Sequence, residues 1–272
     1  MTAGDPEFVA LTRRIAERVG VALDAYKDKC LRRRIAVRMR ACGARTYAEY
    51  LALLDRTPGE YERLSDALTI NVTRFFRNPE TWERLQRTYL PPLWDAHSGP
   101  LRFWSAGCAS GEEAYTLAIL GAELARARGN GDGLERVRVD GTDVDARCLE
   151  RARAACYHAD ALVETPPDLV RRYFELDGAG YRVIEPVRRR VSLRRSDLSR
   201  DPPPARAYDL IVCRNVVIYF DRATQERLFR MFAELLVPGG LLLLGKVETL
   251  FGPARERLAL LDARERIYRR AA

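Results

Sequence analysis

Residues 105–113 read SAGCASGEE, and this stretch decides the fold. It begins at the end of the apolar run Leu101–Ala106 and ends in the first residues of a helical pattern over 112–127. Small side chains allow the backbone to approach a ligand closely, so the stretch is a candidate ligand-binding turn. A tight strand-to-helix turn without a ligand is the alternative. The spacing is neither that of GxGxxG nor that of a P-loop ending in Gly-Lys-Ser/Thr, which excludes both nucleotide motifs.

Short apolar strands alternate with amphipathic helices on both sides of this turn. The alternation predicts an α/β fold with a mostly parallel, doubly wound sheet. Sheets of this kind bind ligands at the carboxyl ends of their strands. The expected strands are 101–106, 137–142, 191–194, 209–213, 241–245 and 266–269, and the expected helices are 112–127, 145–155 and 222–236.

The N-terminal part shows helical rather than alternating apolar spacing. It predicts helices from Phe8 to Gly20, over about 24–42, from Thr46, from Glu60 and over 79–94. We therefore expect a small all-α domain over residues 1–78 and a larger domain over 79–272. Residues 157–190 interrupt the alternation with a turn-rich segment and a possible hairpin, which predicts an insertion or small subdomain.

Composition excludes several classes of protein. Hydrophobic residues make up 47% of the chain and charged residues 31%, the balance of a globular protein. Apolar runs stay too short to cross a bilayer and no secretory signal is present, so we expect a cytoplasmic monomer. With two histidines and six cysteines without a CxxC pair, we expect buried thiols, no metal site and no disulfides. The net charge of +8 favours an acidic partner.

Polar residues follow several of the expected strands. Asp143 ends the second strand beside the small-residue turn, where a carboxylate can accept hydrogen bonds from ribose hydroxyls, while Asp145 is expected to cap the next helix. Asp197 with Leu198, and Arg214 with Asn215, follow the next two strands and are expected to face the same crevice. The convergence predicts a nucleoside-sized site.

Several motifs together resemble one known family. Residues 69–77 (TINVTRFFR), 105–115 (SAGCASGEEAY), 141–145 (GTDVD) and 208–221 (YDLIVCRNVVIYFD), followed by Pro-Gly-Gly at 238–240, closely resemble the chemotaxis receptor glutamate methyltransferases, the CheR family. The resemblance runs in the right order over nearly the whole chain. It implies a class I S-adenosylmethionine-dependent (SAM-dependent) methyltransferase domain that carries an inserted β-subdomain over about 157–190. It also implies S-adenosylhomocysteine as product and the cytoplasmic domain of a methyl-accepting chemoreceptor as partner.

The resemblance also implies site residues. Arg77 and Tyr219 are expected to orient the acceptor and the methyl group, and Phe75 with Phe76 to pack between the domains. Two departures from the family pattern are Ala114, where proline is frequent, and a short turn over 177–181 in the inserted subdomain. The donor-binding residues carried over are Asn71, Thr73, Arg77, Glu113, Asp143, Asp197, Leu198, Arg214 and Asn215.

Receptor recognition is expected to rest on the basic segment 27–40, which holds seven Lys or Arg residues and one acid. Lys29, Arg33 and Arg40 gather opposite its apolar stripe, and a solvated helix face is the alternative interpretation.

Two other functions remain as alternatives. A nucleic-acid methyltransferase acting on exocyclic amines needs an (Asp/Asn/Ser)-Pro-Pro-(Tyr/Phe) loop, where this chain has Arg-Asn-Val-Val-Ile-Tyr over 214–219, so we expect no nucleic-acid substrate. The second alternative is an inactive receptor-binding scaffold.

Overall fold

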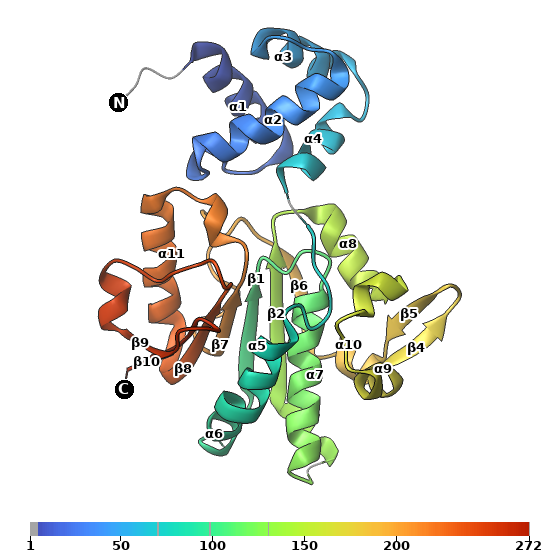
Figure 1. The fold of residues 1–272 in the computed structure, drawn as a ribbon, viewed down its shortest axis with the longest axis vertical. Helices are drawn as coiled ribbons and strands as arrows, with labels where there is room; N and C mark the ends of the chain where they lie inside the picture. The colour runs from blue at the N-terminus through green and yellow to red at the C-terminus, as the bar shows by residue number, and fades with distance from the viewer. Residues whose placement is uncertain (1–4, 70, 98, 130, 272) are drawn as a thin grey trace. The chain divides into compact units, whose positions relative to one another are not determined.

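The computed structural model describes residues 5–69, 71–97, 99–129 and 131–271, and the chain divides into two compact units (Figure 1). The helical unit comprises Met1–Asn71 and Tyr219–Thr224. The sheet unit comprises Val72–Ile218 and Gln225–Ala272. The division therefore falls between residues 71 and 72 rather than after residue 78. It also assigns a short segment near residue 220 to the N-terminal helices, which the sequence did not indicate.

Local signals in the sequence explain the helix boundaries of the helical unit. The side chain of Asp5 caps the first helix, and Gly20 ends it in the left-handed conformation at φ 72°. Thr46 and Glu49 form a capping box on the third helix. The elements are α1 (Pro6–Val19), η1 (Leu23–Ala25), α2 (Asp28–Cys42), α3 (Tyr47–Arg56) and α4 (Glu60–Leu68).

Helix α2 begins at Asp28 rather than near residue 24. Residues 23–25 form a separate 3-10 turn, and Tyr26 is extended with ψ 153°. Tyr26 pairs with Phe220 in an isolated antiparallel bridge, and their rings lie 5.0 Å apart. The start of α2 was predicted too early because the spacing of apolar residues does not show this pairing with a segment distant in sequence.

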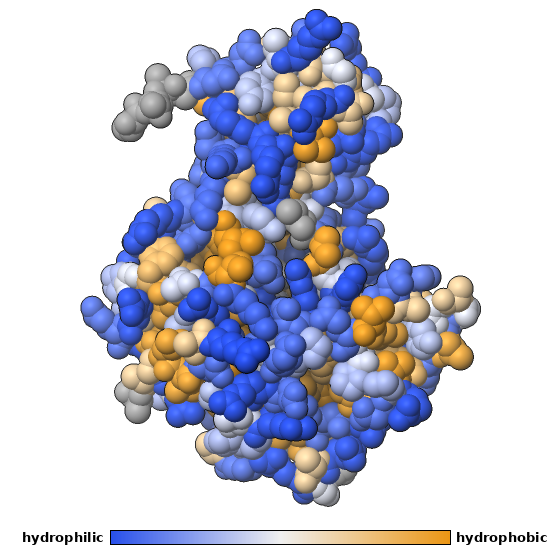
Figure 2. All heavy atoms as spheres, in the orientation of Figure 1, coloured by the Kyte–Doolittle hydropathy of each residue, from blue (hydrophilic) through white to orange (hydrophobic). Residues whose placement is uncertain are grey.

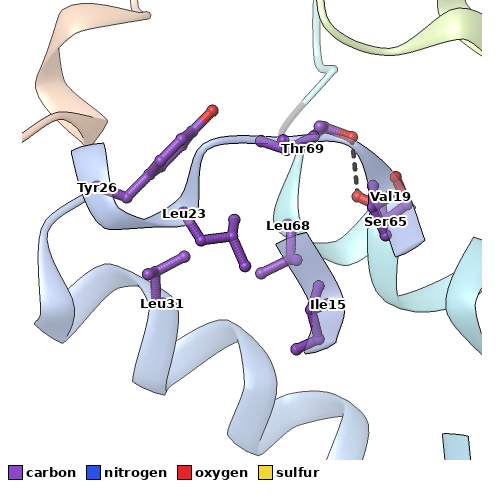
Figure 3. A pocket seen from close by; sticks show the side chains of 9 residues that line it. Ile15, Val19, Leu23, Tyr26, Leu31, Ser65, Leu68 and Thr69 are labelled. Atoms are coloured by element: carbon purple, nitrogen blue, oxygen red, sulfur yellow. Dashed lines mark hydrogen bonds between the residues drawn. The ribbon is translucent and has the colours of Figure 1, made fainter. Parts of the chain in front are cut away.

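The core of the helical unit is built from apolar side chains of all four helices. Leu11, Ile15, Ile35, Tyr50 and Leu64 are completely or almost completely buried. Figure 3 shows Leu23, Leu31 and Leu68 converging around a small apolar pocket, with the Thr69 hydroxyl donating to the Ser65 carbonyl at 3.0 Å.

A buried ion pair joins two helices of this core. Glu60, 1% exposed, accepts hydrogen bonds from Arg38 at 2.7 and 3.0 Å and from the Tyr50 hydroxyl at 2.9 Å. Burial opposes the ionisation of Glu60, but the hydrogen bonds from Arg38 and Tyr50 outweigh it and lower the pKa of its carboxyl. The ion pair therefore fixes α2 against α4.

Replacing Glu60 with Ala is expected to destabilise the protein by about 3 kcal/mol, because it leaves the partly buried Arg38 without its partner. Denaturant unfolding measures the loss, with Glu62→Ala, an exposed position on the same helix, as the control. The Glu60 contribution should be complete above pH 4.5, its ordinary pKa, and disappear as the pH falls through the lower pKa of the folded state. Equal stability of the two variants would contradict the role given to the pair.

The sheet unit is built on a mostly parallel sheet. In the part of the chain that the structure describes, seven strands lie in the order β6-β2-β1-β7-β8-β10-β9. All neighbours up to β8 pair in parallel, and β10 is antiparallel to both β8 and β9. The strands are β1 (Leu101–Ala106), β2 (Val137–Asp143), β6 (Val191–Arg195), β7 (Tyr208–Cys213), β8 (Leu236–Leu244), β9 (Leu258–Asp262) and β10 (Ile267–Arg270).

This architecture confirms the predicted class I methyltransferase fold. The chain runs from β1 to β2 and β6 on one side and returns to β7 and β8 on the other, so the strand order switches at β1. Strand β9 was not predicted from the sequence. The helices and short helical turns are α5 (Pro79–Arg84), η2 (Leu85–Tyr89), α6 (Leu90–Asp95), α7 (Glu112–Ala127), η3 (Gly131–Arg136), α8 (Ala146–Ala154), η5 (Val217–Tyr219), α11 (Arg222–Leu235) and η6 (Pro253–Glu256).

The predicted inserted β-subdomain is present. A small antiparallel sheet has the order β3-β5-β4, and Asp177 pairs with Gly180 so that only residues 178 and 179 form the turn (Figure 1). The buried carboxylate of Glu123 on α7 accepts hydrogen bonds from Arg172 at 2.7 Å and Tyr173 at 2.6 Å. The subdomain elements are β3 (Cys156–Tyr157), η4 (Ala159–Leu162), α9 (Pro167–Tyr173), β4 (Phe174–Asp177), β5 (Gly180–Val183) and α10 (Glu185–Arg188).

Phe75 and Phe76 correct one expectation. Both are buried in the core of the sheet unit, where the Phe75 ring contacts Tyr157 and Phe174 edge-on at 4.8 and 4.9 Å. They therefore belong to the hydrophobic core of the sheet unit.

The structure also bears on the surface, on membrane spans, on metal sites and on the cysteines. Figure 2 shows a mainly hydrophilic surface with separate apolar patches. Over the described ranges, every helix is too short or too polar to cross a membrane, and His, Cys, Asp and Glu nowhere gather as a metal site. Three cysteines are buried as expected, but Cys156 is exposed.

Candidate functional site

The turn after β1 is held by backbone hydrogen bonds to the end of β2. The amides of Gly107 and Cys108 both donate to the carbonyl of Thr142, at 2.8 and 2.9 Å. The next amide, that of Ala109, donates to the Asp143 carboxylate at 2.8 Å. Three consecutive amides are thus directed at β2, which shapes the turn at the point where the strand order switches.

Two glycines in this turn are required by the backbone. Gly107 and Gly111 have φ angles of 91° and 95°, which side chains rarely permit. A Cβ atom at residue 107 would lie 2.4 Å from the side chain of Val216, and one at residue 111 would lie 2.8 Å from the Cβ of Ala152. The small residues therefore allow the turn to pack closely against the loop after β7 and against α8, as well as allowing any approach to a ligand.

Asp143 is a buried carboxylate that connects two loops. It is 9% exposed and accepts hydrogen bonds from the amides of Ala109 at 2.8 Å and Asp145 at 2.9 Å. Burial raises the pKa of Asp143 above its usual value, against the effect of these amides. Each carboxylate oxygen still has a second lone pair for a ribose hydroxyl. Asp145 caps α8 as predicted, accepting from the amides of Arg147 and Cys148.

The end of β7 supplies a buried arginine. Arg214 donates to the carbonyl of Arg77 at 3.1 Å and to the Asn78 side chain at 2.8 Å, and its guanidinium lies 5.0 Å from the ring of Trp82. It also lies 3.7 Å from the carboxylate of Glu113. Its buried Nε has no hydrogen-bond partner within the chain, which leaves one donor for a ligand.

Glu113 lies between a hydroxyl and this arginine. Ser105 donates its hydroxyl to Glu113 at 2.7 Å. Burial raises the pKa of the Glu113 carboxyl, while the charges of Arg214 and Arg77 and the hydrogen bond from Ser105 favour its ionised form. The structure thus brings Arg77, Glu113 and Arg214 together at the carboxyl ends of β1 and β7, as the sequence predicted.

A carboxylate that the sequence analysis missed shapes the loop after β7. Glu248, 2% exposed, accepts hydrogen bonds from the amides of Gly245 at 2.6 Å, Asn215 at 2.9 Å, Val216 at 2.9 Å and Ile218 at 3.3 Å. It therefore orients the loop that carries the predicted donor residue Asn215, whose φ of 60° is unusual for a residue with a side chain. An acidic residue in the loop that follows the apolar run of β8 was the available signal.

The remaining predicted residues lie in two places. Asp197 and Leu198 follow β6, where the amide of Ser196 donates to the Asp143 carbonyl at 2.9 Å, so this loop adjoins the end of β2. Asp197 accepts from the amide and hydroxyl of Ser199. Thr73 is half-buried in the sheet unit.

Asn71 and Tyr219 belong to the helical unit. Asn71 donates to the hydroxyl of Thr69 at 3.0 Å. Arg77 donates to the Val72 carbonyl at 2.9 Å within the sheet unit. The functional roles of all three residues remain predictions.

Comparison with known proteins shows the family to which the chain belongs. Residues 71–267 match the family model described as "CheR methyltransferase, SAM binding domain", and residues 6–69 match "CheR methyltransferase, all-alpha domain". The chain belongs to the CheR methyltransferase family. The match covers both units and names the cofactor, so the CheR-type sheet unit binds SAM as the methyl donor.

Three curated relatives are named as chemotaxis protein methyltransferases, and the first two have the name "Chemotaxis protein methyltransferase". The protein of Listeria monocytogenes is 32% identical over 95% of this chain and 95% of its own length. That of Escherichia coli is 32% identical, covering 91% of this chain and 86% of the relative. In Pseudomonas aeruginosa, "Chemotaxis protein methyltransferase 2" is 35% identical, covering 89% and 86%.

The residues at the strand ends of this CheR-family chain fit such a donor chemically. The unpartnered Nε of Arg214 suits a carboxylate group, and the carboxylates of Asp143 and Glu113 suit hydroxyl or ammonium groups. Bound there, the donor supplies an electrophilic methyl group on a sulfonium.

Asp143→Ala should weaken SAM binding about tenfold or more, since a lost charged hydrogen bond is worth about 1.5–3 kcal/mol. It should also lower thermal stability, because the amides of Ala109 and Asp145 lose their acceptor. Calorimetric titration measures the affinity, with Asp160→Ala at an exposed position as the control. Unchanged affinity in the folded variant would remove Asp143 from the site.

Proposed function

We propose that this methyltransferase esterifies glutamate side chains on the cytoplasmic domain of a chemoreceptor. The observation that carries the proposal is the family match over both units, including the all-α domain at residues 6–69. That domain lies outside the region matched by the SAM-binding model, which supports a separate role for it in recognising the acceptor. The printed names of the relatives, chemotaxis protein methyltransferases, support the same acceptor class.

The chemistry of a glutamate acceptor suits the groups in the site. A glutamate has a reference pKa of about 4.3 and is ionised at neutral pH, so no general base is needed. His97 contacts Asp209 near the start of β7, and His158 is exposed in the β-subdomain, so neither histidine is among the strand-end residues. The absence of a histidine at the described strand ends therefore does not oppose catalysis.

Catalysis then depends on alignment and on exclusion of water. An acceptor oxygen bonds to the methyl carbon while the carbon–sulfur bond breaks, its electron pair remains on sulfur, and no proton moves. Alignment contributes up to about 7–11 kcal/mol in favourable cases. Arg77 and Tyr219 are proposed to orient the acceptor and the methyl group, and the buried residues Asp143, Glu113 and Arg214 to hold the donor.

The product is expected to be a carboxyl methyl ester. Incubation with methyl-labelled SAM and receptor fragments should give label that mild alkali releases as methanol, because esters hydrolyse under conditions that N-methyl groups survive. A Glu-to-Gln change at the modified receptor positions is the control. Base-stable label would contradict the glutamate assignment, and label on DNA or RNA instead would favour the nucleic-acid alternative.

Receptor recognition is proposed to use the exposed cations of α2. Lys29, Arg33 and Arg40 are exposed, and no ion pair is described for them in the part of the chain that the structure covers. Other basic residues of the same helix are engaged within the protein, since Arg32 pairs with Asp28 and Arg38 with Glu60. The three exposed cations are therefore available to an acidic partner, and their attraction should weaken with salt.

Reversing Arg33 and Arg40 to Glu should slow receptor methylation at least tenfold and leave SAM affinity unchanged. Because the β4–β5 turn is short, deletion of the receptor's extreme C-terminus should change the rate little. Initial rates at several ionic strengths measure both effects, with Arg13→Glu on the exposed face of α1 as the matched control. The opposite pattern, in which only the tail deletion matters, would indicate a tail tether.

A further inference from the structure

The segment before α5 has an unusual backbone. Phe76 and Asn78 both have positive φ angles, of 53° and 61°, although both carry side chains. A left-handed conformation is uncommon at residues other than glycine, and it persists where the surrounding structure holds it, often beside a ligand site. Phe76 is 3% exposed, and its amide donates to the Thr116 hydroxyl of α7 at 3.2 Å. The segment is therefore fixed by contacts with the rest of the sheet unit.

The inserted subdomain holds this segment at two points. The amide of Phe75 donates to the carbonyl of Ala161 at 3.0 Å. The amide of Asn78 donates to the carboxylate of Glu164 at 2.8 Å. Glu164 lies between η4 and α9, and its other oxygen is 3.8 Å from the guanidinium of Arg74. A carboxylate of the subdomain thus fixes the backbone at Asn78.

The side chain of Asn78 acts on Arg214 rather than on its own helix. Asn78 directly precedes α5, a position where asparagine usually accepts a hydrogen bond from an amide of the first turn. Its side chain makes no such cap, and its Oδ1 accepts from Nη2 of Arg214 at 2.8 Å instead. In the part of the chain that the structure describes, both hydrogen bonds of the Arg214 side chain go to this segment, the second to the Arg77 carbonyl at 3.1 Å. The segment therefore orients the guanidinium whose buried Nε has no partner within the chain.

We propose that Asn78 is a positioning residue for donor binding and that it links the inserted subdomain to the donor site. Glu164 fixes the amide of Asn78, and Asn78 holds Arg214 so that its Nε stays available to the carboxylate of the donor. All three residues lie in the sheet unit. The inference goes beyond the proposed function, because it concerns the donor and is independent of the acceptor that is methylated.

Substitutions at Asn78 separate the role of its side chain from that of its backbone. Glycine adopts positive φ angles readily, so Asn78→Gly should keep the backbone conformation and remain folded. Its affinity for S-adenosylhomocysteine, measured by calorimetric titration of the full chain, should nevertheless fall about fivefold or more, as expected for coupled sites. Asn78→Asp keeps the oxygen that accepts from Arg214 and should bind like the wild-type protein. This rescue would not occur if the amide side chain had only a packing role.

Substitutions at Glu164 test the other end of the link. Glu164→Ala removes the acceptor of the Asn78 amide and should lower the affinity for S-adenosylhomocysteine by a similar factor. Glu164→Gln keeps a carbonyl oxygen for that amide and should restore most of the affinity. Asp160→Ala, at an exposed acid of the same subdomain, should bind like the wild-type protein.

The double variant tests whether the two residues act through one series of contacts. If they do, Asn78→Gly combined with Glu164→Ala should bind S-adenosylhomocysteine little more weakly than the weaker single variant, whereas independent effects would add. Additive losses would therefore overturn the link between the subdomain and the donor site. Unchanged affinity in both single variants, or an equal loss in Asn78→Gly and Asn78→Asp, would overturn the positioning role. If Asn78→Gly folds poorly, the comparison of Glu164→Ala with Glu164→Gln decides, and equal affinity of these two variants would contradict the inference.

Discussion

The hydrogen bonds from the turn after β1 to the end of β2 are the constraint on which the rest of the site depends. The amides of residues 107 and 108 donate to the Thr142 carbonyl, and the amide of Ala109 donates to Asp143. A turn held in this way places the start of α7, and with it Glu113, at the switch point of the sheet. Glu248 does the equivalent for the loop after β7 by accepting four backbone amides. Two buried carboxylates that accept backbone hydrogen bonds thus shape the loops at these strand ends, and Arg214 and Glu113 add charged groups beside them.

Charge has a different use in each unit. In the sheet unit, buried charges are held by backbone groups or by one another, which keeps the loops rigid for donor binding. In the helical unit, α2 combines a paired arginine, Arg38, with the exposed cations Arg33 and Arg40 and with the unpaired Arg34. A single basic segment therefore contributes to stability through Arg38 and, in our proposal, provides exposed cations for an acidic partner. The composition of the segment could not distinguish paired from exposed cations, because this depends on which face of the helix packs against the rest of the helical unit.

Much of the fold could be predicted from the sequence because it depends on local signals. Gly20 ends α1, Thr46 caps α3 and Asp145 caps α8, each through contacts within a few residues. The ends of the strands that precede Arg214 and include Asp143 could be predicted because apolar runs of strand length stop there. Contacts between distant residues could not be predicted: Glu248 acts on amides about 30 positions away, and Tyr26 pairs with Phe220. The same limit explains the late start of α2 and the true environment of Phe75.

We expect the donor to bind at the carboxyl ends of β1, β2, β6 and β7, beside the loops that Asp143 and Glu248 hold in place. A crystal structure of the protein with S-adenosylhomocysteine tests it most directly. The ribose hydroxyls should bind Asp143, and the carboxylate of the ligand should lie within hydrogen-bond distance of Arg77 or Arg214. A ligand bound away from these strand ends, with no contact to Asp143, would contradict it.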